Sequence, residues 1–115
     1  FGELWLLYRG ALLLAENAAE RLQRAWDKPA LGAAERGELA LLIAEARVAS
    51  ARAALEISSQ VFEAMGARAS ASRYGFDRFW RNVRVHSLHD PLDYKVRDIG
   101  QWLTRGVAPT PSLYS

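Results

Sequence analysis

Apolar residues recur every three or four positions along the start of the chain, the spacing that lines one face of an α-helix. From Leu4 to Trp26 they fall at Leu4, Leu7, Ala11, Leu14, Ala18, Leu22 and Ala25. The first half of this helix, LWLLYRGALLLA, is apolar on nearly every side, so we expect it to contact two neighbouring helices or a second chain. The short segment DKPALG follows, and its proline and glycine predict a turn into an antiparallel second helix.

The second predicted helix is long and runs from Ala34 to Met65, with Gly66 placed to end it in the left-handed conformation. Two apolar stripes run along it, one through Leu41, Val48, Leu55 and Phe62 and the other through Leu39, Ile43, Ala46, Ala53 and Ile57. A third stripe is charged and holds Glu38, Glu45, Arg52, Glu56 and Glu63. Because only one stripe suits water, we expect this helix to lie between partners.

Two shorter helices are predicted after the polar loop ARASASRYG. The first runs from Phe76 to about Val85. The second begins with a helix-start signal in which Asp90 is the N-cap, Pro91 the first helical residue and Asp93 the acidic residue three positions after the cap. Its buried face is predicted at Leu92, Val96, Ile99 and Leu103. Gly106 is expected to end it, and the tail VAPTPSLYS shows no periodicity.

The composition agrees with a globular all-α protein, an antiparallel helical bundle. Half of the 115 residues are apolar, and no strand pattern or internal repeat interrupts the helical spacing. No apolar run approaches the ~20 residues that cross a bilayer, so we expect no membrane span. The chain opens on Phe1 without a leader of the secretory type, which suggests part of a longer protein. It has no cysteine, which fits a reducing, cytoplasmic compartment.

Basic residues are dense in the third predicted helix and the loop before it, at Arg68, Arg73, Arg78, Arg81 and Arg84. Arginines interleaved with aromatic residues suit nucleic acid. The net charge is only +2, however, and three of these arginines lie three positions apart on one helical face, where ordinary salt bridges to the glutamates of the long helix account for them. We therefore expect no nucleic-acid partner. Arg68 is the exception, because it follows a helix-ending glycine where a turn and a guanidinium can hold an anion.

The sequence brings His86, His89 and Asp90 together between the last two helices. A metal site needs at least three well-aimed ligands, and we expect none here because Asp90 serves as a helix cap. Two interpretations of the histidines stay open. They are ordinary loop residues, or they are acids, bases or hydrogen-bond donors that face a ligand, since imidazole exchanges a proton near neutral pH.

The run EAMGARASASRYGFDRFWRNVRVHSLHDPLDYKVRDIGQWLTRG resembles the C-terminal helical domain of the acyl-CoA dehydrogenase superfamily. Within that superfamily it is most similar to the flavin-dependent monooxygenases of the dibenzothiophene monooxygenase type. The resemblance implies that residues 1–115 are a single helical domain, a C-terminal fragment of a longer flavoenzyme that lacks the first helix of the bundle. It also implies a homo-oligomer, either a dimer or a tetramer.

Two departures from the dehydrogenase branch bear on the function that the resemblance implies. Asp90 stands where dehydrogenases have a catalytic glutamate, and MGARAS replaces their paired glycines. Both departures favour an FMNH2-dependent monooxygenase over an FAD-dependent acyl-CoA dehydrogenase with Asp90 as base. A hypothesis of another class is a helical module that serves only oligomerisation, without chemistry.

The monooxygenase branch also implies roles for particular residues. His86 and His89 would be catalytic, stabilising a flavin hydroperoxide or supplying its proton as oxygen passes from O2 to a small organic substrate. Gly66, Ala67 and Arg68, together with His89, would contact the cofactor. That cofactor would be FMN, reduced by a separate flavin reductase, with FAD as the alternative. The fragment alone is expected to be inactive.

Overall fold

The computed structural model of the chain describes residues 1–113, and all regular structure in that range is helical. The elements are α1 (Gly2–Trp26), α2 (Ala33–Met65), the short 3-10 turn η1 (Ala67–Ser70), α3 (Asp77–His89) and α4 (Leu92–Arg105). The prediction of an all-α antiparallel bundle is confirmed. Among these helices none is long and apolar enough to cross a membrane.

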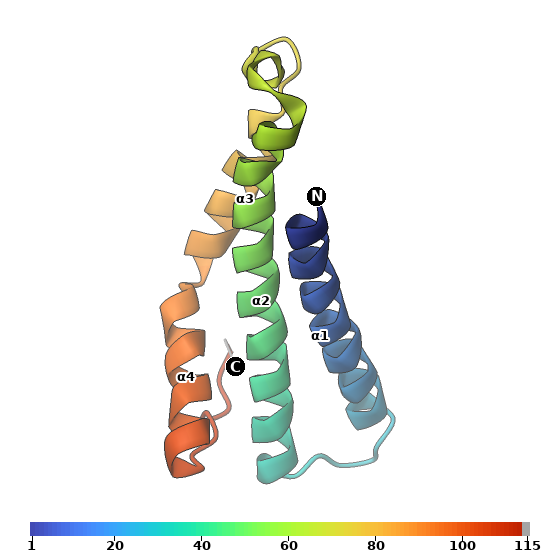
Figure 1. Ribbon diagram of the computed structural model, residues 1–115. Coiled ribbons are helices and arrows are strands. Elements are labelled where there is room, and N and C mark those ends of the chain that lie inside the picture. The colour runs from blue at the N-terminus through green and yellow to red at the C-terminus, as the bar shows by residue number, and fades with distance from the viewer. Residues whose placement is uncertain (114–115) are drawn as a thin grey trace.

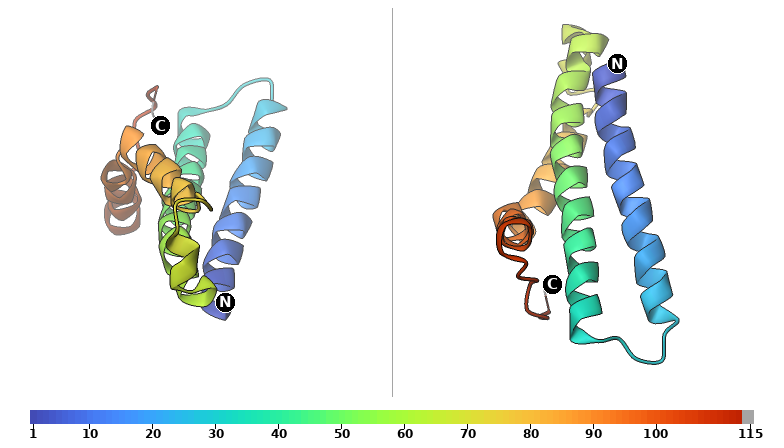
Figure 2. Two further views of the ribbon diagram at one scale, coloured as in Figure 1. Left: turned by 90° about the horizontal axis from the view of Figure 1, so that it is seen from above. Right: turned by 60° about the horizontal axis from the view of Figure 1, so that its bottom comes forward.

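The long helix α2 forms the centre of the molecule (Figure 1). On one side α1 runs antiparallel to it, as the proline and glycine of the connecting segment predict. On the other side α3 descends from the far end of α2 and α4 continues beyond a sharp break (Figures 1 and 2). Neighbours on two sides of α2 are what its two apolar stripes predict.

The interface between α1 and α2 is built from small side chains. Ala11 and Ala18 of α1 are buried, and so are Ala46 and Ala53 of α2. Small residues bring two helices close together but leave the large apolar residues outside: Trp5 is 59% exposed. The first half of α1 is predicted to contact two neighbouring helices or a second chain. Within this chain α2 covers one side of it, and the second contact stays a prediction.

The molecule is long and thin for its size. Its principal extents are 54 × 24 × 24 Å and its radius of gyration is 17.0 Å, whereas a compact domain of this length has a radius of gyration of about 13 Å. The 33 residues of α2 account for the long axis, since a helix rises 1.5 Å per residue. Among residues 1–113 no large side chain is fully buried. The fold therefore leaves apolar surface open for further segments to cover.

Both glycines predicted to end helices occupy those positions, but only one has the conformation expected. Gly106 follows α4 with φ 66° and ψ 21°, the left-handed conformation. Gly66 follows α2 with φ 81° and ψ 167°, so the prediction of a left-handed stop is wrong there. This region is essentially restricted to glycine. It lets the chain leave α2 and enter η1 at once, with the Ala69 N–H donating to the Gly66 carbonyl.

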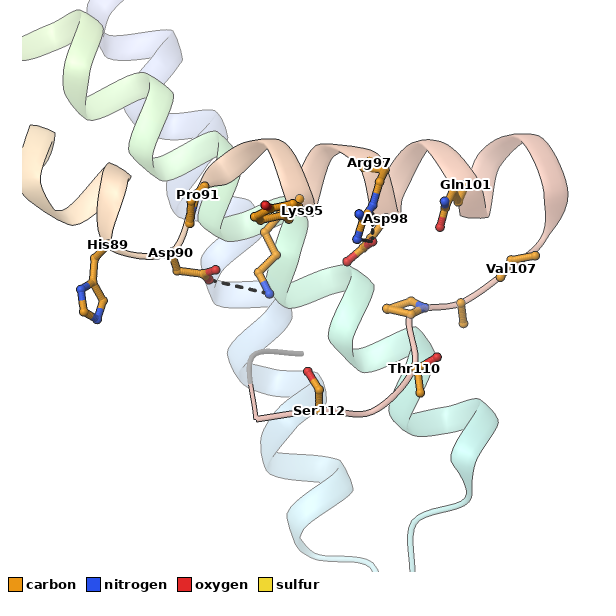
Figure 3. Close-up of a pocket in the computed structure, with 13 residues that line it drawn as sticks. His89, Asp90, Pro91, Lys95, Arg97, Asp98, Gln101, Val107, Thr110 and Ser112 are labelled. Atoms are coloured by element: carbon orange, nitrogen blue, oxygen red, sulfur yellow. Dashed lines mark hydrogen bonds and ion pairs between the residues drawn. The ribbon is translucent and has the colours of Figure 1, made fainter.

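The tail after α4 folds back against the first turns of α2. A Cβ built on Gly37 would lie only 2.8 Å from the Ala108 Cβ, so a glycine at that position admits the tail. Figure 3 shows the tail passing beneath α4. Residues 107–112 have no helix or strand, in agreement with their lack of periodicity, and the last two residues of the predicted tail lie outside the described range.

Candidate functional site

The two histidines lie in the last turn of α3, which ends at His89. The predicted end of this helix near Val85, and the interpretation of His86 and His89 as loop or hinge residues, are therefore wrong. The helix continues past Val85 because the break in helical backbone comes at Asp90. Asp90 precedes a proline, which disfavours helical backbone, and it adopts φ −125° and ψ 99°. Both histidines are exposed, and both project from a rigid helical turn.

The carboxylate of Asp90 does not cap α4. The N-cap position belongs to Pro91, which makes no side-chain cap hydrogen bond, so the predicted N-cap and first helical residue are each wrong by one position. The Asp90 carboxylate instead contacts two cations: its Oδ2 lies 3.4 Å from Arg47 Nε and 3.7 Å from Lys95 Nζ. These side chains are largely buried, with exposures of 25% for Asp90, 20% for Arg47 and 11% for Lys95. Burial strengthens their pairing relative to a surface ion pair.

Arg47, in the middle of α2, connects to both sides of the break between α3 and α4. Its Nη1 lies 3.2 Å from His86 Nε2. Its Nη2 donates to two backbone carbonyls, those of His86 at 3.3 Å and Asp90 at 3.0 Å. One guanidinium therefore binds a histidine ring, the last turn of α3 and the residue at the break. We call Arg47, His86, Asp90 and Lys95 the corner cluster.

Sequence reasoning missed Arg47, although a signal was present. On a helical projection Arg47 falls between the two apolar stripes of α2 and opposite its charged stripe. A cation at such a position must find partners inside the fold, because leaving it unpaired there is costly. Its partners come from a segment about forty residues away in the chain, and spacing along one helix cannot identify them.

The two histidines open onto different clefts. His86 lines a cleft of about 680 Å³ between α1, α2 and α3, with Ala15, Ala18 and Asn82 among its other residues. His89 lies at the edge of a cleft of about 550 Å³ between the start of α4 and the tail (Figure 3). In the figure Lys95 reaches back to Asp90, and Arg97 pairs with Asp98 deeper in the same cleft. The cleft beside His89 is thus lined by charged side chains on α4 and by apolar residues of the tail such as Val107 and Pro109.

Gly66, Ala67 and Arg68 lie far from the histidines within this chain. All three are exposed, at the end of α2 and in η1. Arg47 contacts His86, and Gly66 directly follows Met65 at the end of α2. The rise of α2 from Arg47 to Met65, at 1.5 Å per residue, therefore separates His86 from the Gly66 turn by roughly 27 Å. A Cβ on Gly66 would meet nothing within 4 Å, so the turn is open to a ligand. The chain does not bring the two predicted groups into one cavity.

The basic residues of α3 form local contacts. Arg81 Nε lies 2.8 Å from Asp77 Oδ2 in the same helix, so the predicted bridge from this residue to a glutamate of α2 is wrong. This hydrogen bond from Arg81 is the main reason that the pKa of Asp77 is lowered. Arg78 lies over the ring of Phe79, 4.9 Å from its centroid. Within residues 1–113 no group of three or more histidine, cysteine or acidic residues is arranged to hold a metal ion.

Residues 6–94 match the protein family described as "Acyl-CoA dehydrogenase, C-terminal domain". The whole chain is 47% identical to a probable FMNH2-dependent monooxygenase, SfnC, of Pseudomonas putida and spans 29% of that protein. It is 48% identical over its whole length to a dibenzothiophene monooxygenase of Rhodococcus erythropolis and spans 28% of it. The chain therefore covers less than a third of these relatives.

A solved structure has nearly the same fold. The crystal structure of TdsC from Paenibacillus sp. A11-2 with FMN and indole superposes with a TM-score of 0.94 and 43% sequence identity. That likeness covers 99% of this chain and 29% of the other. The arrangement of α1 to α4 thus also occurs as part of a larger protein.

Proposed function

The chain belongs to the family of acyl-CoA dehydrogenase C-terminal domains, and from this premise we propose that it is the helical domain of an FMNH2-dependent monooxygenase. The names of two relatives over 45% identical, one an FMNH2-dependent monooxygenase and one a dibenzothiophene monooxygenase, support this reading. The activity belongs to the complete protein, and residues 1–115 contribute one surface of its site.

The observation that carries the proposal is the pairing of Asp90. A dehydrogenase reading requires Asp90 as a base that takes a proton from an acyl-CoA. Its carboxylate instead pairs with Arg47 and Lys95, so both partners hold it inside the fold rather than against an acyl-CoA. The neighbouring imidazoles are exposed and can donate or accept a proton. The corner cluster therefore suits a site that uses histidine for proton transfer.

The donors present in the chain fit a flavin. Arg68 offers an exposed guanidinium beside the open turn at Gly66 and Ala67, a group that suits a phosphate or the polar edge of a ring system. His86 and His89 offer ring nitrogens that hydrogen-bond to polar atoms. When bound, reduced FMN would supply the electrons that activate O2. One FMN is too short to span the roughly 27 Å between the two groups, so they would contact different cofactors in the oligomer.

The substrate class follows from the relatives. One relative is named as a dibenzothiophene monooxygenase, and one crystal structure of TdsC contains indole. We propose that the complete protein oxygenates a small organic molecule, either a sulfur compound or an aromatic heterocycle. Reduced FMN would come from a separate reductase in the cytoplasm, and the enzyme would act as a homodimer or homotetramer.

The open apolar trough of the chain supports the proposed domain organisation. Two adjoining clefts share Ala54 and Ile57, and together they run between α1, α2 and α3 past Val83; the cleft that holds His86 adjoins them at Ala54. We propose that in the complete protein a further helix, the first of the bundle, occupies this trough, with residues 1–115 forming the rest of one domain.

The experiment measures product formation by the complete protein with a test set of organic sulfides and indoles, a flavin reductase, FMN and NADH. We expect oxygenation that depends on the reductase, and no oxidation of acyl-CoA with a dye acceptor.

His86→Gln and His89→Gln should lower kcat by about a hundredfold, the lower end of what loss of acid–base catalysis costs. If the complete protein oxidised acyl-CoA with the dye acceptor instead, the acyl-CoA dehydrogenase hypothesis would be favoured. Full turnover by both variants would make the histidines structural, and a stable oligomer inactive in every assay would favour the oligomerisation module.

A further inference from the structure

The contact between Arg47 and His86 determines where the imidazole carries its proton. An arginine side chain has five N–H groups, no acceptor and a charge that is never lost in proteins. Arg47 Nη1 therefore donates across the 3.2 Å that separate it from His86 Nε2. A ring nitrogen accepts a hydrogen bond only through its lone pair, so Nε2 must be unprotonated. In the neutral ring the proton then resides on Nδ1.

We propose that Arg47 is a positioning residue that holds His86 as the tautomer protonated on Nδ1, so that His86 presents a hydrogen-bond donor from that nitrogen. No described residue forms a hydrogen bond with Nδ1, while the residue itself lines the cleft between α1, α2 and α3. The step from this tautomer to turnover rests on the proposed function, and the tautomer itself does not.

The backbone contacts of Arg47 keep the ring from moving away. The last carbonyls of a helix have no partner within the helix, and Arg47 Nη2 donates to those of His86 and Asp90. The same side chain thus holds the ring nitrogen of His86 and the main chain that carries the ring. A guanidinium fork can make several such bonds at fixed angles, which a lysine ammonium cannot reproduce.

Asp90 and Lys95 fix the guanidinium in turn. Arg47 Nε is buried without a hydrogen-bond partner, and the Asp90 carboxylate 3.4 Å away balances its charge as an ion pair. Lys95 approaches the same carboxylate oxygen at 3.7 Å, which holds that oxygen in place. Asp90 therefore positions the guanidinium of Arg47, and Arg47 positions the ring of His86.

The test measures the tautomer directly in the complete protein. Histidine is labelled with 15N, and His86→Gln identifies the resonances of residue 86. In the wild type, two-bond nitrogen–proton correlations should show Nδ1 protonated and Nε2 unprotonated. Arg47→Met should abolish this preference, while Arg52→Met, which removes an exposed arginine of the same helix, should leave it intact. Arg47→Lys keeps one donor and should preserve the tautomer in part. Protonation of Nε2 in the wild type would overturn the proposal, whether or not any variant folds.

Turnover gives the second measurement. Arg47→Met should lower kcat by about tenfold or more with KM nearly unchanged, and it should raise the hydrogen peroxide released per O2 consumed. Arg47→Lys should recover part of the loss. Unchanged kcat and peroxide release in an Arg47→Met enzyme that has lost the tautomer would overturn the positioning role. If the complete protein performs no flavin-dependent oxygenation while the wild-type tautomer is as stated, the proposed function fails and the assignment of the tautomer stands.

Discussion

The two sides of α2 are held by different kinds of interaction. Toward α1 the contact is made by small apolar residues such as Ala46 and Ala53, which bring the helices close without specifying any single atom. Toward α3 and α4 the contact includes the corner cluster, in which Arg47 binds a ring nitrogen, two carbonyls and a carboxylate. Apolar burial is non-directional, whereas hydrogen bonds require particular distances and angles. The side that carries the histidines is thus the side with fixed geometry.

The difference also concerns what each side leaves for other molecules. The alanine interface leaves an apolar trough along α1 and α3, lined by residues such as Tyr8, Phe79 and Val83. The corner cluster leaves exposed imidazoles beside the break between α3 and α4. The first surface suits a further helix, and the second suits a ligand with hydrogen-bonding groups. One chain therefore carries an assembly surface and a candidate reactive surface, which adjoin at the cleft that His86 and Val83 line.

The largest expected effect comes from weakening the packing on the side of the corner cluster. Leu41 is 4% exposed and lies one turn after Gly37, which contacts the tail. Leu41→Ala should lower the free energy of unfolding of the 115-residue chain by about 2–5 kcal/mol, because it removes buried methyl groups and leaves a cavity. Urea denaturation followed by circular dichroism measures this change. Ile43→Ala, at a residue 42% exposed, is the control and should cost less than half as much. Equal losses would mean that the two positions are packed alike.

The same contrast decides what the sequence could predict. Periodicity identified all four helices, because the helical stripes depend on local spacing. It placed the end of α3 four residues early. It also assigned Asp90 to a helix cap, because the true partners of Asp90 are Arg47 on α2 and Lys95 in the first turn of α4. The resemblance implied roles for His86 and His89, which stay predictions, and it gave no role to Arg47. Contacts between distant segments, which set the proton position on a ring, follow only from the three-dimensional arrangement.

The trough should make the isolated chain self-associate, with a smaller effect on free energy. Burying apolar surface yields roughly 25 cal/mol per Å², and the first half of α1 borders the open trough with Tyr8 and Leu12. Light scattering at micromolar concentration should detect dimers. Ile57→Glu places a charge in the trough and should raise the dissociation constant at least tenfold, about 1.4 kcal/mol. Leu103→Glu should leave the constant unchanged, because Leu103 is 77% exposed on α4 and outside the trough, contrary to its predicted place on the buried face. A monodisperse monomer for the unmodified chain would contradict this expectation.

The smallest expected effect concerns the ion pair between Asp77 and Arg81, an exposed counterpart to the corner cluster. Its side chains are 61% and 71% exposed, and solvent screening makes such pairs weak. The hydrogen bond from Arg81 is the largest cause that lowers the pKa of Asp77 below its ordinary value. A lowered pKa in the folded state means that the pair stabilises the fold above the ordinary value, and that this contribution disappears as pH falls through the lowered one. Arg81→Ala should return the pKa of Asp77 upward in an NMR titration of its carboxyl carbon, without a measurable change in the urea midpoint at neutral pH. A pKa that stays low in this variant would show that the helix N-terminus, rather than Arg81, stabilises the charge.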